Sequence, residues 1–222
     1  MPGYGYGISQ FLTSTKSAAT GGGPFEYTPI DNNYSMEFDG ANNIVTGINT
    51  GTNDVTICYW IKTTTTHAYT LTQCAFGGRN NGSGDNYTLG RLGSAFSTPN
   101  DTKVRVFNTL GTTKLNDGNW HFIAYTYDYT TKEVKAYVDG NTTPEVTATF
   151  PGYSTSFPIS IGNNGLILYF TGNVDECAYF NSVLSESTIE AIYNTTNDSD
   201  TGQVADLSET PEGAPVAWYR FE

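Results

Sequence analysis

Hydrophobic and polar residues alternate with a period of two along most of the chain from residue 34 onward. The segment 34–39 (YSMEFD) shows this alternation, and 132–138 (KEVKAYV) follows 120–128 (WHFIAYTYD) in the manner of a hairpin. Successive side chains of a β-strand point to opposite faces, so the alternation predicts strands. The segment 54–62 (DVTICYWIK) is largely apolar on both faces, which is typical of a central strand covered on both sides.

Turn residues separate these segments at intervals of roughly 8–12 residues. Asp-Gly pairs follow two of the segments, at Asp39-Gly40 and Asp139-Gly140. Further short strands are expected at 44–48, 69–77, 87–92, 103–108, 112–114, 158–162 and 173–180. About ten or more strands without alternating helices predict an all-β, two-sheet antiparallel sandwich.

One segment near the C-terminus has helical spacing instead. Ile189, Ile192 and Tyr193 recur at intervals of three and four residues, and Ser185 or Ser187 can serve as the N-cap. We therefore expect a single short helix that directly follows a long strand.

Four motifs in order carry a family resemblance: YSMEFDG, VTICYWIK, the pair WHFIAYTYD and VKAYVDG, and SIGNN followed by FTGNVDECAYFNSVLSESTIEAIY. Together they span about Tyr34 to Tyr193 and resemble the laminin G-like and pentraxin-like (concanavalin A-like) jelly rolls. The resemblance implies a two-sheet jelly roll with one short C-terminal helix. It also implies a non-catalytic role in glycan or protein recognition, often with one structural Ca²⁺. The chain departs from many relatives in having AWYRFE (217–222) at its end, and we expect this segment to return beside the first strand.

Residues 1–30 lack periodicity and are rich in Gly, Ser, Thr and Pro. They are interpreted as an extended N-terminal arm, and residues 31–222 as the jelly-roll domain. A disordered tail is the alternative interpretation of the arm.

The net charge of −12 argues against partners with anionic surfaces, because it repels both nucleic acid backbones and anionic lipid headgroups. No apolar run approaches the roughly 20 residues of a membrane span. The N-terminus lacks the pattern of a secretory signal, so synthesis in a cytoplasm is expected. Cys58, Cys74 and Cys177 are interpreted as buried free thiols, with a Cys58–Cys177 disulfide as the alternative.

Catalytic motifs are not convincing. Relatives of this fold that hydrolyse glycans use Glu-x-Asp-x-x-Glu, but here Glu37 and Asp39 are followed by Asn42 where the second Glu is needed. Asp175 and Glu176 are adjacent, so a regular strand would point them to opposite faces. His67 is expected in solvent, and His121 is expected to pack or form hydrogen bonds at a sheet end.

Two sets of residues are candidates for binding. Asp39 and Asp175 are the best carboxylates for a structural Ca²⁺, because the first and last core strands of a jelly roll are neighbours. The Gly- and Asn-rich loop after residue 77 offers guanidinium, amide, carboxylate and aromatic groups for a glycan: Arg79, Asn81, Asp85 and Tyr87. The alternatives are a capped turn at Asp39, a solvent-facing Asp175 and a merely polar loop.

The leading hypothesis is a non-enzymatic module on the surface of a virion, such as a phage capsid decoration or a tail fibre protein. The arm would contact other virion or self subunits, and the sandwich would face outward and bind cell-surface glycans. The alternative is a bacterial secreted or surface carbohydrate-binding domain. A glycoside hydrolase ranks last because it rests on fold analogy alone.

Overall fold

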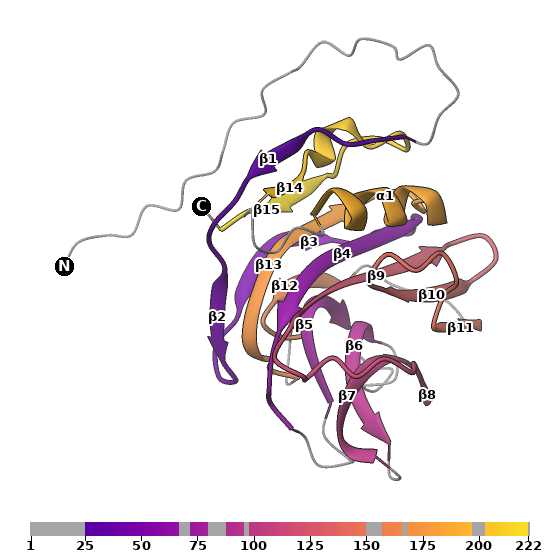
Figure 1. Ribbon diagram of the computed structural model, residues 1–222. Helices are drawn as coiled ribbons and strands as arrows, with labels where there is room; N and C mark the ends of the chain where they lie inside the picture. Colours follow the sequence, from indigo (N-terminus) through magenta and orange to yellow (C-terminus); the bar gives the residue numbers. More distant parts are fainter. Residues whose placement is uncertain are drawn as a thin grey trace.

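The computed structural model describes residues 25–66, 72–79, 88–95, 98–149, 157–165, 168–196 and 203–221. Two antiparallel sheets pack face to face, and a small cap that contains the helix lies on the outer face of one of them (Figure 1). The expected two-sheet jelly-roll architecture is confirmed.

The first sheet has seven strands, in the order β11-β10-β9-β4-β13-β15, with β2 also paired to β13. Its strands are β2 (Met36–Asp39), β4 (Val55–Lys62), β9 (Trp120–Asp128), β10 (Glu133–Val138), β11 (Val146–Thr149), β13 (Thr171–Phe180) and β15 (Ala217–Tyr219). β4 is buried along its whole length except Lys62, because one face meets the second sheet and the other meets the cap. The two apolar faces of this segment predicted that position.

The second sheet has six strands, in the order β3-β12-β5-β6-β7-β8. Its strands are β3 (Ile44–Asn49), β5 (Thr72–Arg79), β6 (Thr88–Ala95), β7 (Thr98–Val106), β8 (Thr109–Leu110) and β12 (Pro158–Ile161). Aliphatic and aromatic residues from both sheets fill the space between them, including Ile57, Tyr59, Phe76, Leu92 and Val104. This cluster is the main core.

The expected strand at 112–114 is wrong. The Glu145 carboxylate accepts the backbone N–H of Thr112 at 2.9 Å and that of Thr113 at 3.2 Å. These donors therefore bond a side chain rather than a neighbouring strand, and β8 ends earlier.

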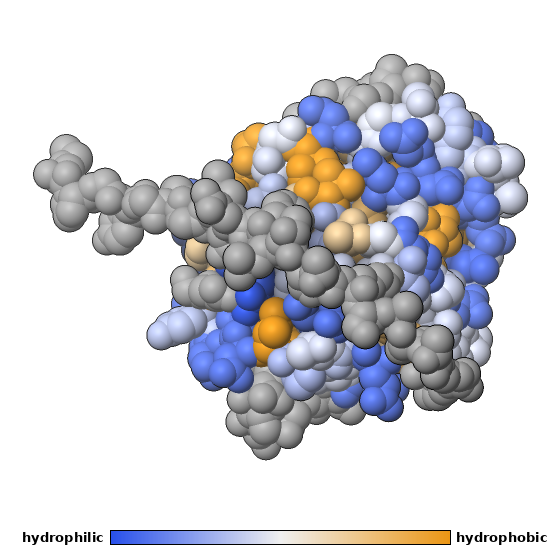
Figure 2. All heavy atoms as spheres, turned by 90° about the horizontal axis from the view of Figure 1, so that it is seen from above, coloured by the Kyte–Doolittle hydropathy of each residue, from blue (hydrophilic) through white to orange (hydrophobic). Residues whose placement is uncertain are grey.

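A cap covers the outer face of the seven-stranded sheet. It consists of α1 (Glu186–Thr196), the paired strands β1 (Pro29–Asp31) and β14 (Gln203–Ala205), and the 3-10 turn η2 (Leu207–Glu209). Its apolar residues form a second core with Trp60 and Phe122 of the sheet. Viewed from the cap side, the surface is mostly hydrophilic, and its apolar residues lie in separate patches (Figure 2).

The helix begins where the sequence predicted. The Ser185 hydroxyl accepts the backbone N–H of Thr188 at 3.2 Å, so Ser185 is the N-cap. The Glu212 carboxylate accepts the backbone N–H of Ser185 at 2.9 Å and the hydroxyl of Thr188 at 2.8 Å. A residue from the C-terminal segment therefore fixes the start of α1.

The segment 25–31 belongs to the cap. Tyr27 is buried, its hydroxyl lies 3.1 Å from the Thr210 hydroxyl, and the Thr28 backbone N–H donates to Glu209 at 2.8 Å. The boundary at residue 30 suggested by composition thus falls within β1. Most of the expected arm, residues 1–24, lies outside the described residues.

The C-terminal strand lies in line with the first strand of the domain. β2 pairs with residues 171–174 of β13, and β15 pairs with residues 177–179 of the same strand. The two short strands therefore share one edge of β13 end to end. The segment AWYRFE returns toward the first strand, as expected, but it pairs with β13 and not beside β2. All three cysteines are buried and free, also as predicted.

Candidate functional site

The strand β13 contains a bulge at the junction between β2 and β15. Two residues of β13, Glu176 and Cys177, lie opposite the single residue Tyr59 of β4. Glu176 has a left-handed backbone conformation with φ of +49°, which is uncommon for a residue other than glycine. The expectation that Asp175 and Glu176 point to opposite faces is wrong, because this extra residue breaks the alternation.

One amide side chain contacts both carboxylates. Asn32 Nδ2 donates to both Asp175 oxygens at 3.3 Å, and it also donates to Glu176 Oε1. Asn32 is 7% exposed and follows β1, so the N-terminal segment reaches the bulge directly. The two acids therefore form a pair, contrary to the sequence-based expectation.

The C-terminal segment completes this cluster. Trp218 Nε1 donates to Glu176 Oε2 at 2.5 Å, and Arg220 Nε lies 3.6 Å from Glu176 Oε1. Arg220 Nη2 also donates to the Asp31 carbonyl at 2.8 Å. The cluster joins three segments of the chain: residues 31–32, the middle of β13 and residues 218–220.

Burial raises the pKa of both acids. Glu176 is 5% exposed, and its pKa rises to about 8 through burial and the charge of Asp175, while Arg220 and the hydrogen bonds offset part of the rise. The pKa of Asp175 rises to about 6, again chiefly through burial. The cluster therefore ionises near neutral pH.

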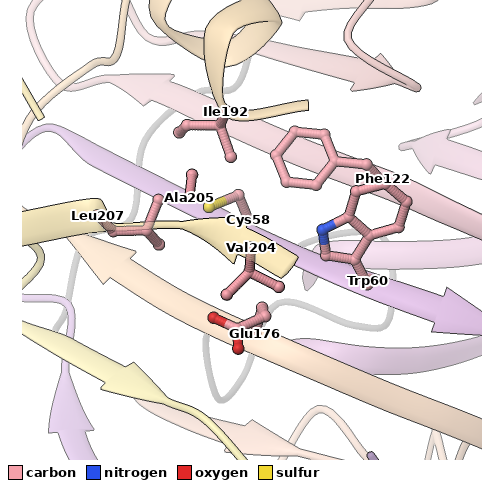
Figure 3. Close-up of a pocket in the computed structure, with 8 residues that line it drawn as sticks. All are labelled: Cys58, Trp60, Phe122, Glu176, Ile192, Val204, Ala205 and Leu207. Atoms are coloured by element: carbon pink, nitrogen blue, oxygen red, sulfur yellow. The ribbon is translucent and has the colours of Figure 1, made fainter. Parts of the chain in front are cut away.

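Glu176 lines a cavity that is too small to hold a sugar. The cavity beside Glu176 has a volume of about 10 Å³, which corresponds to roughly one water molecule. Figure 3 shows the Glu176 carboxylate at one side of this cavity, with Cys58 and apolar side chains such as Ile192 and Leu207 around the rest. This cavity has no room for a sugar ring.

The two carboxylates predicted to bind Ca²⁺ are not brought together. Asp39 is paired with Thr171, four residues before Asp175 along β13, a separation of about 13 Å. The Asp39 carboxylate accepts the backbone N–H of Ala41 at 2.9 Å and the side-chain amide of Asn42 at 3.0 Å, which is the expected alternative of a capped turn. One ion cannot bind both acids, since Ca²⁺–oxygen distances are about 2.3–2.6 Å.

Within the described parts of the chain, no group of three or more His, Cys, Asp or Glu side chains is arranged to hold a metal ion. The predicted structural Ca²⁺ itself stays a prediction.

His121 forms hydrogen bonds at one end of the sheet, as expected. Its Nδ1 lies 2.8 Å from Asp139 and its Nε2 lies 3.2 Å from Asp117. Burial lowers the pKa of His121, but the hydrogen bonds and charges of the two aspartates outweigh burial and raise it. This arrangement links the turn after β10 to the start of β9.

Of the four predicted glycan-binding residues, the structure describes one. Arg79 is the last residue of β5, opposite Thr88 of β6, and is half-buried. Asn81, Asp85 and Tyr87 lie outside the described residues. The glycan site predicted on this loop stays a prediction.

The two sheets carry opposite net charges. The strands of the six-stranded sheet hold four basic residues and one acid, a net charge of +3: Arg79, Arg91, Lys103 and Arg105 against Asp101. The strands of the seven-stranded sheet hold two basic and six acidic residues, a net charge of −4: Lys62 and Lys135 against Glu37, Asp39, Asp128, Glu133, Asp175 and Glu176. In a chain of net charge −12, the positive side chains of the sandwich are therefore concentrated on one sheet.

The arginines of β6 and β7 lie side by side on the outer face of that sheet. Leu92 and Val104 are paired and belong to the core, so the residues that alternate with them point away from it. The same register places Arg91 opposite Arg105. Arg91 Nη1 and Arg105 Nε both donate to the carbonyl oxygen of Phe107, at 3.2 and 2.9 Å.

Sequence reasoning missed this arginine pair. Three of the four arginines of the chain fall one each on β5, β6 and β7, and the fourth is Arg220. That spacing was visible in the sequence. Only the pairing of β6 with β7 shows that two of the arginines are neighbours, however.

A family model matches residues 30–190, about three-quarters of the chain, and its description is the concanavalin A-like lectin/glucanase superfamily of laminin G type. The chain belongs to this superfamily. A search among curated proteins found no match. No helix in the described part of the chain is long and apolar enough to cross a lipid bilayer.

Solved structures with this superfamily fold include proteins with carbohydrate ligands. A Bacteroides ovatus chain whose assigned role is carbohydrate binding has a TM-score of 0.58 and 16% identity, covering 89% of this chain and 52% of that one. CBM40 of the Ruminococcus gnavus IT-sialidase, bound to α2,3-sialyllactose, has a TM-score of 0.51 and 14% identity, covering 75% and 98%. A heptameric SAP-like pentraxin from Limulus polyphemus has a TM-score of 0.50 and 12% identity, covering 77% and 90%. At these identities the likeness concerns the fold.

Proposed function

We propose that this protein is a non-catalytic carbohydrate-binding module that binds its glycan on the outer face of the six-stranded sheet. The observation that carries the proposal is the arrangement of the two outer faces. The described cap elements pack on the outer face of the seven-stranded sheet, whereas the outer face of the other sheet carries the ammonium group of Lys103 and the guanidinium group of Arg105, both on half-buried side chains. Such groups donate the hydrogen bonds that orient a sugar.

Two further observations support a binding role. The superfamily includes lectins, and the Bacteroides ovatus and Ruminococcus gnavus structures are carbohydrate-binding by assignment or by bound ligand. Of the two acids at the bulge, Asp175 and Glu176, the second lines a cavity too small for a sugar ring. Carbohydrate binding without hydrolysis agrees with both the family match and the small cavity beside Glu176.

A glycan array probed with the labelled full-length chain tests this function. We expect binding to a restricted set of glycans and no change in their chain length after prolonged incubation, as measured by mass spectrometry. Parallel arrays with calcium and with EDTA would test the predicted Ca²⁺. No binding to any glycan under either condition would contradict the proposal, and shortened glycans would contradict its non-catalytic part.

We further propose that the protein is displayed outside the cell on the surface of an assembly. A virion surface is the first candidate, and a bacterial cell surface is the alternative. Weak glycan binding gains avidity when many copies are displayed, and an arm can anchor each copy. Only residues 1–24 should be removed to test the arm, because Tyr27 is buried in the cap. Light scattering after size-exclusion chromatography should show a defined oligomer for the full chain and a monomer for the shortened one. Equal masses would count against the arm as an assembly device.

A further inference from the structure

We propose that the glycan is acidic, and that Arg105 and Lys103 of β7 bind its carboxylate or sulfate group beside Gly93 of β6. This inference rests on the proposed function and specifies its ligand class. It is carried by the charge of the sheet, by the geometry of the arginine pair and by the close packing of Arg105 over Gly93.

Charge limits where this molecule can bind an anion. The whole chain carries −12, and the strands of the seven-stranded sheet carry −4, so an acidic sugar is repelled over most of the surface. The strands of the six-stranded sheet carry +3. Their one acid, Asp101, lies 3.4 Å from Lys114 and is already compensated.

Hydrogen bonds hold the guanidinium groups of Arg91 and Arg105 in fixed positions. Phe107 has a left-handed backbone conformation with φ of +53° in the two-residue loop between β7 and β8, and its carbonyl accepts from both guanidinium groups. Arg105 Nη2 also donates to Asn108 Oδ1 at 3.3 Å. Two guanidinium groups that converge in this way form a compact positive centre, which suits the planar oxygens of a carboxylate or the oxygens of a sulfate.

A tyrosine from the opposite sheet fixes the backbone beneath this pair. The buried Tyr125 hydroxyl accepts the backbone N–H of Arg105 at 3.1 Å and donates to the Arg91 carbonyl at 2.5 Å. The contact ties β6 to β7 from the core side. The two arginines thus project from a rigid part of the sandwich, which is how binding groups are kept in register with a ligand.

Gly93 leaves room for Arg105 to lie across β6. A Cβ atom at this position would lie 3.0 Å from Arg105 Cδ and 3.0 Å from Thr72 Cγ2. Lys103 is directly opposite Gly93 in the register. Arg91 is only 6% exposed, whereas Lys103 and Arg105 are half-buried, so the β7 side chains are the ones that reach a ligand.

Isothermal titration of the full-length chain with matched sugars tests the proposal. The probes are lactose, 3′-sialyllactose and lactose 3′-sulfate, together with galactotriose and trigalacturonate. We expect at least one acidic sugar to bind about tenfold or more tightly than its neutral counterpart, with an affinity that falls as salt rises. The carboxylated and sulfated probes distinguish the two kinds of anion.

Three variants locate the site. Arg105→Gln is expected to lower the affinity for the acidic sugar about tenfold and to change that for the neutral one little. Lys135→Gln, on the other sheet, removes the same charge and should leave both affinities unchanged. Gly93→Ala should weaken acidic binding by displacing Arg105, with an unchanged melting temperature as the control for folding.

The outcomes separate this inference from the proposed function. Tight binding of neutral sugars alone, or equal losses in Arg105→Gln and Lys135→Gln, would overturn the acidic ligand while leaving a carbohydrate-binding module. If no sugar in the titration and no glycan on the array bound the protein, both the acidic ligand and the carbohydrate-binding function would be overturned.

Discussion

Glu176 has a left-handed backbone conformation inside a strand, which costs about 1–2 kcal/mol for a residue with a side chain. The hydrogen bonds from Asn32 and Trp218 and the nearby charge of Arg220 offset this cost. The same contacts hold the N-terminal and C-terminal segments at one point of β13. The cluster is therefore interpreted as a structural junction.

The ionisation of Glu176 predicts how stability depends on pH. A carboxyl group whose pKa is raised on folding binds its proton more tightly in the folded state. Its contribution is therefore fully present below the unfolded value of about 4.5 and is lost as the pH rises through about 8. The raised pKa values of Asp175 and His121 act in the same direction. The free energy of unfolding should thus fall as the pH rises from 5 to 8.

Glu176→Gln should reduce this fall by about 1–3 kcal/mol, because the glutamine keeps an acceptor for Trp218 and has no charge to bury. Urea unfolding at several pH values measures the effect. Glu37→Gln, at an exposed position of β2, is the matched control and should follow the parent protein. Parallel curves for the parent and Glu176→Gln would show that burial of this acid does not govern the pH dependence.

At the scale of elements, alternation predicted the long strands well. The predicted segments 54–62 and 120–128 correspond to β4 and β9 within one residue, because each crosses the core and its pattern reflects burial. The three-residue strands β1 and β14 were missed, since so short a segment has no periodicity. The bulge in β13 was missed because Glu176 does not belong to a residue type that favours left-handed backbone.

The contact between the cap and the sheet depends on a glycine. Gly140 has φ of +67°, and a Cβ atom there would lie 2.5–2.6 Å from atoms of Tyr193. The Tyr193 ring stacks on Trp60 of β4 with a centroid distance of 5.7 Å. Close approach at Gly140 therefore positions the end of α1 on the seven-stranded sheet.

Gly140→Ala should destabilise the fold by about 1 kcal/mol from backbone strain and by about 1–3 kcal/mol more from the clash with Tyr193. Gly47→Ala separates the two effects. Gly47 has a similar φ of +76°, but a Cβ atom there meets nothing within 4 Å. Urea unfolding measures both losses, and tryptophan fluorescence reports the Trp60 environment. Equal losses in the two variants would argue against the contact.

At the scale of the whole molecule, the motifs from Tyr34 to Tyr193 were sufficient to predict the jelly roll, but the candidate site needed the structure. Arg79 and Asp175 were singled out from the sequence, whereas the partners of Asp175 lie 143 residues upstream at Asn32 and 45 residues downstream at Arg220. Arg91 and Arg105 become neighbours only through strand pairing. Long-range register decides such contacts, and local pattern does not encode it.

The opposite charges of the two sheets give the molecule two different outer faces. One face is covered by a cap whose apolar residues form the second core, and the other carries the positive side chains. A module built in this way can use one sheet for stability and the other for recognition.

Nuclear magnetic resonance of the isotopically labelled full chain, titrated with the tightest glycan from the array, tests the central claim most directly. The account predicts that backbone amide shifts change on β5, β6 and β7, around Arg79, Gly93 and Arg105, and stay constant in α1 and β14. Shifts confined to the cap, or to the junction at Asp175 and Glu176, would contradict it and move the binding site to the other sheet.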